Sequence, residues 1–170
     1  YDSPLGAGTG AAVIFGTTGG VMAAALRTVA EVVLGEEITD VEYNDVRGME
    51  QTREAVIKVG EAEVKIAVVH TLASAKKMLD RIKEGTADYH FIEVMACPGG
   101  CIGGDGQPVP VNAEIRQKRR EALFECDRAN ELRKSHENPE IKVLYDTWLG
   151  KPLGEKAHSL LHTHYSEQKR

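Results

Sequence analysis

The stretch Glu93-Val-Met-Ala-Cys-Pro-Gly-Gly-Cys-Ile-Gly-Gly-Asp-Gly-Gln-Pro108 places two thiols in a glycine-rich loop directly after an apolar run. Glycine adopts positive φ and leaves room for a bulky group beside the backbone. Cys97 and Cys101 at the mouth of such a loop suit a soft metal, above all zinc or an iron–sulfur cluster. Their spacing alone also fits a redox pair or two unrelated thiols, so the surrounding residues must decide.

The elements that flank this loop predict an α/β fold. Residues 89–95 form a compact apolar strand that ends at the loop, and the helical pattern of residues 71–84 separates it from a strand at 63–70. Strand, helix and strand in this order imply a βαβ crossover with parallel pairing. Ligand loops of open α/β sheets follow the carboxyl ends of strands. We therefore expect residues 97–108 and the glycine-rich turn 16–20 to face one site.

The rest of the chain predicts a mixed, largely parallel sheet flanked by helices, with a helical carboxyl-terminal third. Strands are expected at residues 11–15, 38–46 and 55–59, and the last of these forms a hairpin with 63–70. Helices are expected at residues 21–34, 112–134, 139–149 and 155–162. The helix at 71–84 is expected to bury one apolar face, made of Leu72, Ala75, Leu79 and Ile82.

Composition sets the bounds on function. The chain has 170 residues, 42% of them apolar and 28% charged, which are ordinary values for one globular domain. Its net charge of −5 gives no reason to expect a nucleic-acid partner. No apolar run approaches the length of a membrane span, so membrane insertion is not expected. The chain opens with Tyr1 rather than methionine, and we expect it to begin inside a longer polypeptide.

The cysteine count points to an incomplete site. Three cysteines do not make a disulfide framework. A cubane 4Fe–4S cluster normally takes four cysteine ligands, so this chain alone cannot complete one. Cys126 lies in the apolar stripe of its helix and is expected to be an inert buried thiol. The basic run at residues 116–120 is expected to be a solvated face of the same helix.

The cysteine stretch resembles the third cluster-binding motif of iron-only (FeFe) hydrogenases, E-x-M-x-C-x-x-G-C-x-x-G-G-G-Q-P. Asp105 is the one departure, at a position where the family usually has glycine. A second stretch, Ala12-Val-Ile-Phe-Gly-Thr-Thr-Gly-Gly-Val-Met-Ala-Ala-Ala-Leu-Arg27, resembles the family's F-G-A-T-G-G-V-M-E-A-A-L-R segment, with Thr17 and Ala23 departing. Shorter matches at residues 2–6, 134–138, 150–152 and 157–165 extend the resemblance over nearly the whole chain.

The resemblance implies an H-cluster, in which a 4Fe–4S cubane is joined to a two-iron subsite. By position, Cys97 corresponds to a terminal cubane ligand and Cys101 to the thiolate that bridges to the two-iron subsite. Met95, Phe15 and Gly16 correspond to residues that line the two-iron pocket, so the catalytic assignments are Cys101 and Met95. Glu93 is expected to be a buried hydrogen-bond partner. His158 and His162 share a helix face, but the family has no ligands there, and surface or packing roles are expected.

The implied activity is the reversible reduction of protons, 2H⁺ + 2e⁻ ⇌ H₂. The family's two other cluster motifs do not occur in this chain. Residues 1–170 are therefore expected to be a single domain, the carboxyl-terminal lobe of the H-cluster domain, which is inactive in isolation. The alternatives are a non-hydrogenase iron–sulfur protein of the nuclear prelamin-recognition group and a hydrogen-sensing regulator. Met95 and Phe15, which correspond to two-iron pocket residues, favour the hydrogenase over the first alternative.

The resemblance also implies partners. These are the missing amino-terminal part of the same enzyme and an electron carrier, which is a ferredoxin, a cytochrome or an NAD(P)H-linked subunit. Additional iron–sulfur clusters would belong to the missing parts. A cytoplasmic location is expected, with the periplasm as the alternative.

Overall fold

The computed structural model describes residues 6–35 and 37–166, which divide into two compact units. The larger unit, residues 8–135, contains the sheet and the cysteine loop. The smaller unit contains residues 136–166 together with residues 6 and 7. Most of the expected family match at residues 2–6 lies outside the described residues.

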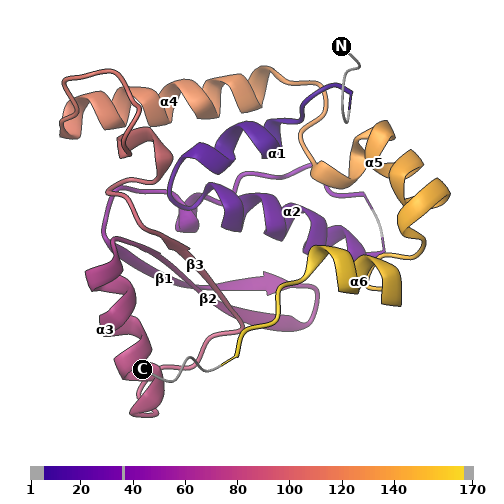
Figure 1. Cartoon of the computed structure of the whole chain (residues 1–170), viewed down its shortest axis with the longest axis horizontal. Coiled ribbons are helices and arrows are strands. Elements are labelled where there is room, and N and C mark those ends of the chain that lie inside the picture. Colours follow the sequence, from indigo (N-terminus) through magenta and orange to yellow (C-terminus); the bar gives the residue numbers. More distant parts are fainter. Residues whose placement is uncertain (1–5, 36, 167–170) are drawn as a thin grey trace. The chain divides into compact units, whose positions relative to one another are not determined.

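A three-stranded mixed sheet forms the centre of the larger unit, in the order β1-β2-β3 (Figure 1). β1 (Thr52–Val59) and β2 (Ala62–His70) pair antiparallel as the predicted hairpin, and Gly60 provides the turn with a φ of +59°. β3 (Phe91–Met95) pairs parallel with β2, after the chain has crossed through α3 (Leu72–Lys83). The predicted α/β class and the βαβ crossover are therefore confirmed.

Two helices cover opposite faces of this sheet. On one face, α2 (Gly20–Leu34) packs Met22, Leu26 and Ala30 against apolar residues of β1 and β2. On the other face, α3 packs Ala75 and Met78 against β2. α2 ends at Gly35, whose φ of +69° confirms the predicted stop.

The buried face of α3 differs from the predicted one. Ser74, Ala75 and Met78 are its buried residues, while Leu72 is 68% exposed, Leu79 is 55% exposed and Ile82 is 36% exposed. Thr71 starts the helix, and its side-chain oxygen accepts a hydrogen bond from the Ser74 N–H group. Because Ser74 is a small residue next to Ala75, this side of α3 can approach the sheet closely.

The strand predicted at residues 11–15 is wrong. The chain forms α1 (Gly10–Val13) followed by a single 3₁₀ turn, Ile14–Gly16. Thr9 caps α1 by accepting a hydrogen bond from the Ala12 N–H group at 3.2 Å. A short apolar run does not distinguish a buried strand from a buried helix, and here the cap decides for the helix.

The strand predicted at residues 38–46 is also absent from the described residues, where only a 3₁₀ turn, Asn44–Val46, is regular. Val41 and Val46 are buried as the apolar pattern requires. Their carbonyl oxygens, however, accept hydrogen bonds from Arg27 and Arg53 rather than from a neighbouring strand. Arginine side chains thus satisfy a backbone that the sequence pattern assigned to a sheet.

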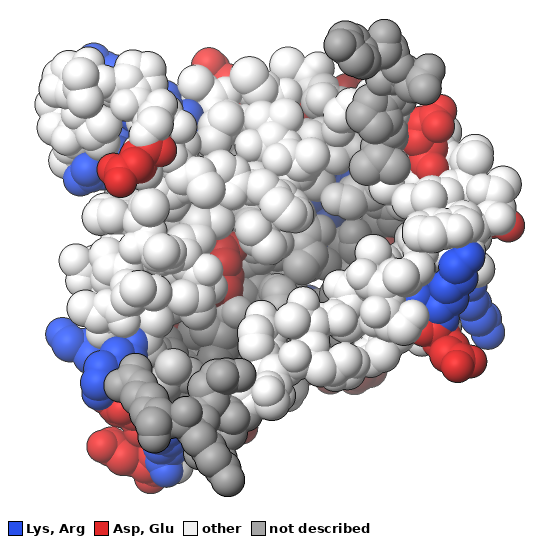
Figure 2. Space-filling view, in the orientation of Figure 1, with Lys and Arg blue, Asp and Glu red and all other residues white. Residues whose placement is uncertain are grey.

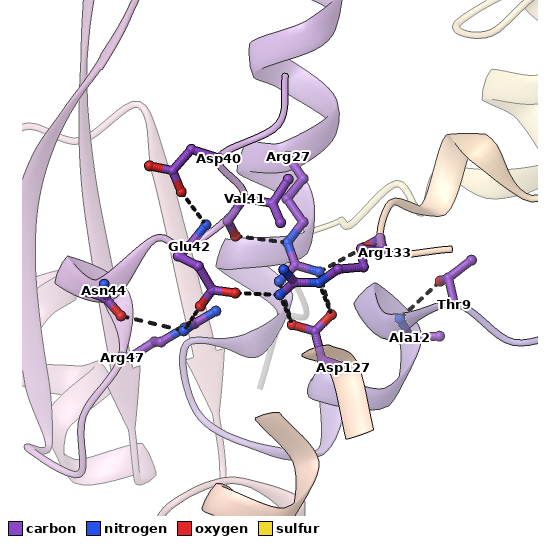
Figure 3. Close-up of polar contacts among 10 residues, drawn as sticks. All are labelled: Thr9, Ala12, Arg27, Asp40, Val41, Glu42, Asn44, Arg47, Asp127 and Arg133. Atoms are coloured by element: carbon purple, nitrogen blue, oxygen red, sulfur yellow. Dashed lines mark hydrogen bonds and ion pairs between the residues drawn. The ribbon is translucent and has the colours of Figure 1, made fainter. Parts of the chain in front are cut away.

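α4 (Ala113–Ala129) begins at the Asn112 cap and is shorter than the predicted helix at 112–134, because the chain is irregular after Asn130. It lies along α1 (Figure 1) and buries Phe124 and Asp127. Asp127 forms an ion pair with Arg27 of α2, and neither side chain is accessible to solvent. Arg133 and Glu42 extend this pair into the network drawn in Figure 3, which ties α2, α4 and residues 41–47 together.

The smaller unit is helical, as predicted. Its helices are α5 (Pro139–Leu144), a π-helical continuation (Tyr145–Leu149) and α6 (Glu155–Leu161). Asn138 caps α5 and also donates a hydrogen bond to the Ala7 carbonyl oxygen.

Among the described helices, none is long and apolar enough to cross a membrane. Basic and acidic side chains lie beside one another at several places on the face shown in Figure 2.

Candidate metal centre

β3 delivers the cysteine loop, and hydrogen bonds within the loop fold it into consecutive tight turns. The Thr71 N–H group donates to the Met95 carbonyl oxygen at 2.8 Å, which fixes the end of the strand. The Gly100 N–H group donates to the Cys97 carbonyl oxygen at 3.0 Å, and the Gly104 N–H group donates to that of Cys101 at 3.1 Å. Each of the two cysteines thus begins its own turn.

Two glycines make room for sulfur atoms. A Cβ atom on Gly100 would lie 2.7 Å from Met95 Sδ and 2.8 Å from the Thr18 nitrogen. A Cβ atom on Gly104 would lie 3.2 Å from Cys97 Sγ. Gly100 also has a φ of +92°, which disfavours other residues. The loop is therefore shaped around the Cys97 thiol and the Met95 thioether.

The second glycine-rich turn reaches the same place. The Thr18 N–H group donates to the Gly99 carbonyl oxygen at 3.0 Å. Gly16 and Cys101 line one cavity of about 400 Å³. The prediction that residues 16–20 and 97–108 face one site is confirmed, although the first turn follows a helix rather than a strand.

Glu93 lies in β3, just before the cysteine loop, and its side chain binds the glycine-rich turn and the start of α2. Its side chain is 5% exposed, and its two carboxylate oxygens accept hydrogen bonds from the Gly19 and Met22 N–H groups at 2.6 and 2.7 Å. Burial raises the pKa of Glu93, while these two donors oppose that shift. The predicted role as a buried hydrogen-bond partner is confirmed, and it holds the start of α2 against β3.

The predicted site residues lie around this junction with different exposures. Cys97 and Met95 are half-buried, while Cys101 is exposed. Gly16 is half-buried, and the Phe15 side chain is 47% exposed. Thiol and thioether sulfurs are soft donors, and with the space that the glycines leave they fit an iron–sulfur group.

The described residues do not complete a metal site by themselves. Within residues 6–35 and 37–166, no three His, Cys, Asp or Glu side chains gather closely enough to hold a metal ion. Cys97 and Cys101 therefore require further ligands from other residues if they bind a cluster. The exposed rings of His158 and His162 stack on each other at 4.4 Å between centroids.

Two predictions for α4 are wrong. Cys126 is exposed, because the helix buries Phe124 and Asp127 instead. The basic run is only partly solvated: Lys118 is exposed, but Arg116, Arg119 and Arg120 are half-buried. The Arg119 guanidinium donates to the Ile102 and Pro108 carbonyl oxygens, and the Arg120 guanidinium lies 5.3 Å from the Phe124 ring centroid.

Sequence reasoning missed Arg119 as a neighbour of the cysteine loop. The sequence carried no specific signal for this contact, because Arg119 is one member of a basic run. Thr18 lies in the turn 16–20, which was expected to face the loop, and makes its contact through a backbone N–H group.

The chain is similar to proteins of one family along most of its length. The family profile described as iron only hydrogenase large subunit, C-terminal domain, matches residues 1–105, and the profile described as iron hydrogenase small subunit matches residues 113–168. The NADP-reducing hydrogenase subunit HndD of Solidesulfovibrio fructosivorans is 52% identical over 171 residues, which are 100% of this chain and 29% of that protein. The chain thus spans less than a third of this curated relative.

The chain is also similar to a solved structure and to a more distant relative. A variant of the [FeFe]-hydrogenase HydA1 from Chlamydomonas reinhardtii matches 97% of this chain and 48% of its own, with a TM-score of 0.71 and 42% identity. A nuclear prelamin A recognition factor of Xenopus laevis is 26% identical over 144 residues, which are 85% of this chain and 32% of that protein.

Proposed function

Because the chain belongs to the iron-only hydrogenase large-subunit family, we propose that it forms the carboxyl-terminal lobe of an H-cluster domain that interconverts protons, electrons and H₂. The observation that carries this proposal is the Cys97–Cys101 loop, which leaves room for a soft-metal group and lies against the Met95 thioether. The activity belongs to the longer polypeptide, since this chain spans 29% of its hydrogenase relative. Residues 1–170 would act in it as one domain.

The chain's own residues have separate tasks in this proposal. Cys97 and Cys101 would hold the cubane, and the family motif assigns to Cys101 the further role of joining it to the two-iron subsite. A thiolate suits that role because it has lone pairs for two metals. Met95, Phe15 and Gly16 would line the two-iron pocket. The bound H-cluster would supply the redox chemistry, while the protein fixes its position and solvent access. Glu93 would hold the glycine-rich turn 16–20 in place beside the cysteine loop.

The alternative functions are less well supported. The prelamin recognition factor is half as similar to this chain as the NADP-reducing hydrogenase subunit is, with 26% identity against 52%. A hydrogen-sensing regulator would share the site described here, and only flanking domains outside this chain would separate it from the enzyme. The name of the hydrogenase relative favours an NAD(P)H-linked subunit as electron carrier, with a ferredoxin or a cytochrome as alternatives. A cytoplasmic location accords with a nicotinamide-linked carrier, and the periplasm is the alternative.

The test uses the full-length polypeptide that contains this chain. It is reconstituted without oxygen with iron, sulfide and a synthetic two-iron precursor, and hydrogen evolution is measured with reduced methyl viologen. We expect sustained turnover together with infrared bands of bound CO and CN⁻, and neither from residues 1–170 alone. A cubane signal without these bands would favour the non-hydrogenase alternative. Bands with little turnover would favour the regulator.

Asp105 is expected to have little influence on the cluster, although it adds a carboxylate to the loop. Its side chain is exposed, and water and salt screen an exposed charge. Asp105→Gly should shift the reduction potential of the cubane by less than about 20 mV, the equivalent of roughly 0.5 kcal/mol for one electron. A redox titration followed by electron paramagnetic resonance measures this shift. A clearly larger change would mean that the carboxylate acts on the cluster directly.

A further inference from the structure

The second half of the cysteine loop is held by a single side chain from α4. Arg119 Nη1 donates to the Ile102 carbonyl oxygen at 2.8 Å, and Nη2 donates to the Pro108 carbonyl oxygen at 2.7 Å. A guanidinium carries its donors in a rigid planar fork, so one side chain can fix two carbonyl groups at once. Arg119 thereby ties the residue after Cys101 to the end of the loop.

The two hydrogen bonds from Arg119 to the Ile102 and Pro108 carbonyl oxygens form a clamp, which the loop's other hydrogen bonds do not replace. The Thr18 N–H group holds Gly99, which precedes Cys101. Bonds within the loop join Gly103 to Gly100 and Gln107 to Gly104, the latter at 3.4 Å. Among the side chains that the structure describes, Arg119 is the only one that hydrogen-bonds the backbone of residues 101–108. Without it, no described side chain would hydrogen-bond the backbone on the far side of Cys101.

Arg119 and Cys101 also line the same cavity of about 400 Å³, which Gly16 borders too. The hydrogen bonds from Arg119 therefore fix the backbone beside Cys101 at the edge of this cavity.

We propose that Arg119 is a positioning residue that orients the Cys101 thiolate for its bridging role. This inference rests on the proposed function. Arg119 lies in the part of the chain that matches the small-subunit profile, whereas Cys101 lies in the part that matches the large-subunit profile. Helix α4 therefore completes a site whose cysteines belong to the other part.

The experiment compares three variants of the full-length enzyme. Arg119→Ala removes the clamp, Arg119→Lys keeps the charge but loses the fork, and Arg128→Ala is the matched control. Arg128 is an exposed arginine near the end of the same helix and remote from the loop in sequence. The first measurement is amide hydrogen exchange in the cofactor-free protein. Exchange at Gly103, Gly104 and Gln107 should accelerate by about tenfold in Arg119→Ala, the change expected from losing a hydrogen bond to a charged donor.

The second measurement separates positioning from general loss of structure. In the reconstituted enzyme, the infrared bands of the two-iron subsite are compared with the paramagnetic signal of the cubane. We expect the infrared intensity of the two-iron subsite, divided by the paramagnetic signal of the cubane, to fall by about tenfold or more in Arg119→Ala. Losses of this size are typical when a group that orients a metal ligand is removed. Arg119→Lys should recover part of this ratio, and Arg128→Ala should match the wild type. A purely structural role would lower both signals together, along with the melting temperature.

The outcomes are distinguishable from failure of the proposed function. If the wild-type enzyme shows no two-iron bands, the proposed function is wrong, and amide exchange still decides whether Arg119 clamps the loop. If the loop amides exchange equally in Arg119→Ala and Arg128→Ala, the clamp is wrong. An unchanged ratio of subsite to cubane in Arg119→Ala, or a parallel fall of both signals, would overturn the positioning role.

Discussion

Replacing Cys101 by serine in the full-length enzyme is expected to abolish hydrogen turnover and to prevent retention of the two-iron subsite. Serine has a hydroxyl that stays protonated at neutral pH and offers a hard oxygen, so it cannot replace a thiolate that bridges two metals. Cys97→Ser should have a different effect, because Cys97 corresponds to a terminal cubane ligand. It should weaken the cubane first and the two-iron subsite only as a consequence.

Infrared spectroscopy after reconstitution measures this prediction directly, together with the hydrogen evolution rate. Cys126→Ser is the matched control, because Cys126 is an exposed thiol of α4 and not a predicted ligand. The control should retain the CO and CN⁻ bands and the turnover of the wild type. Bands at wild-type intensity in Cys101→Ser would show that Cys101 does not bridge, even if the activity were lost.

The cysteine loop was predictable because metal binding and the backbone conformation of the loop require the same residue types. Between Glu93 and Pro108, glycine is required where sulfur atoms or the backbone of the turn 16–20 come close to the loop. These glycines are visible directly in the sequence. β2, α3 and β3 were also predictable, since their apolar patterns have the periods of a strand and a helix. Glu93 followed from its position two residues before Met95, on the same face of the strand.

The remaining features depend on partners that are distant in the sequence. Residues 38–46 have the pattern of a strand, but Arg27 takes a carbonyl group that a strand partner would have used. Arg119 looks like one member of a solvated basic run, and only the approach of α4 to the cysteine loop gives it two backbone acceptors. A single sequence predicts local conformation, whereas such contacts depend on how the elements pack.

Asp127→Asn is expected to cause the largest loss of stability in the larger unit. Asp127 accepts hydrogen bonds from both terminal nitrogens of Arg27 at 2.8 Å, and both side chains are inaccessible to solvent (Figure 3). Asparagine preserves the volume but removes the charge, so Arg27 would remain buried without its counter-ion. Breaking a buried ion pair in this way costs about 3–5 kcal/mol. Because a whole domain is stable by only about 5–15 kcal/mol, the variant should be close to unfolding.

Denaturant unfolding of the chain measures the effect as a lower midpoint. Asp80→Asn is the control, because Asp80 pairs with Lys76 on the exposed surface of α3. Such a surface pair contributes about 0.3–0.5 kcal/mol, so the control should unfold almost like the wild type. A loss below about 1 kcal/mol in Asp127→Asn would mean that the backbone carbonyl oxygens of Val41 and Arg133, which also accept hydrogen bonds from Arg27, satisfy the guanidinium without Asp127.

The pH dependence of stability identifies the ion pair as the cause. Burial alone would raise the pKa of Asp127, but hydrogen bonds and charges of Arg27 and Arg133 outweigh burial and hold the pKa below its ordinary value. A carboxyl group whose pKa is lowered by folding stabilises the protein above its unfolded pKa, and this contribution is lost as pH falls through the folded pKa. The difference between wild type and Asp127→Asn should therefore be full near neutral pH and shrink in acid, below the ordinary range of aspartate. A difference that stays constant throughout acid titration would assign the effect to packing rather than to the charge of Asp127.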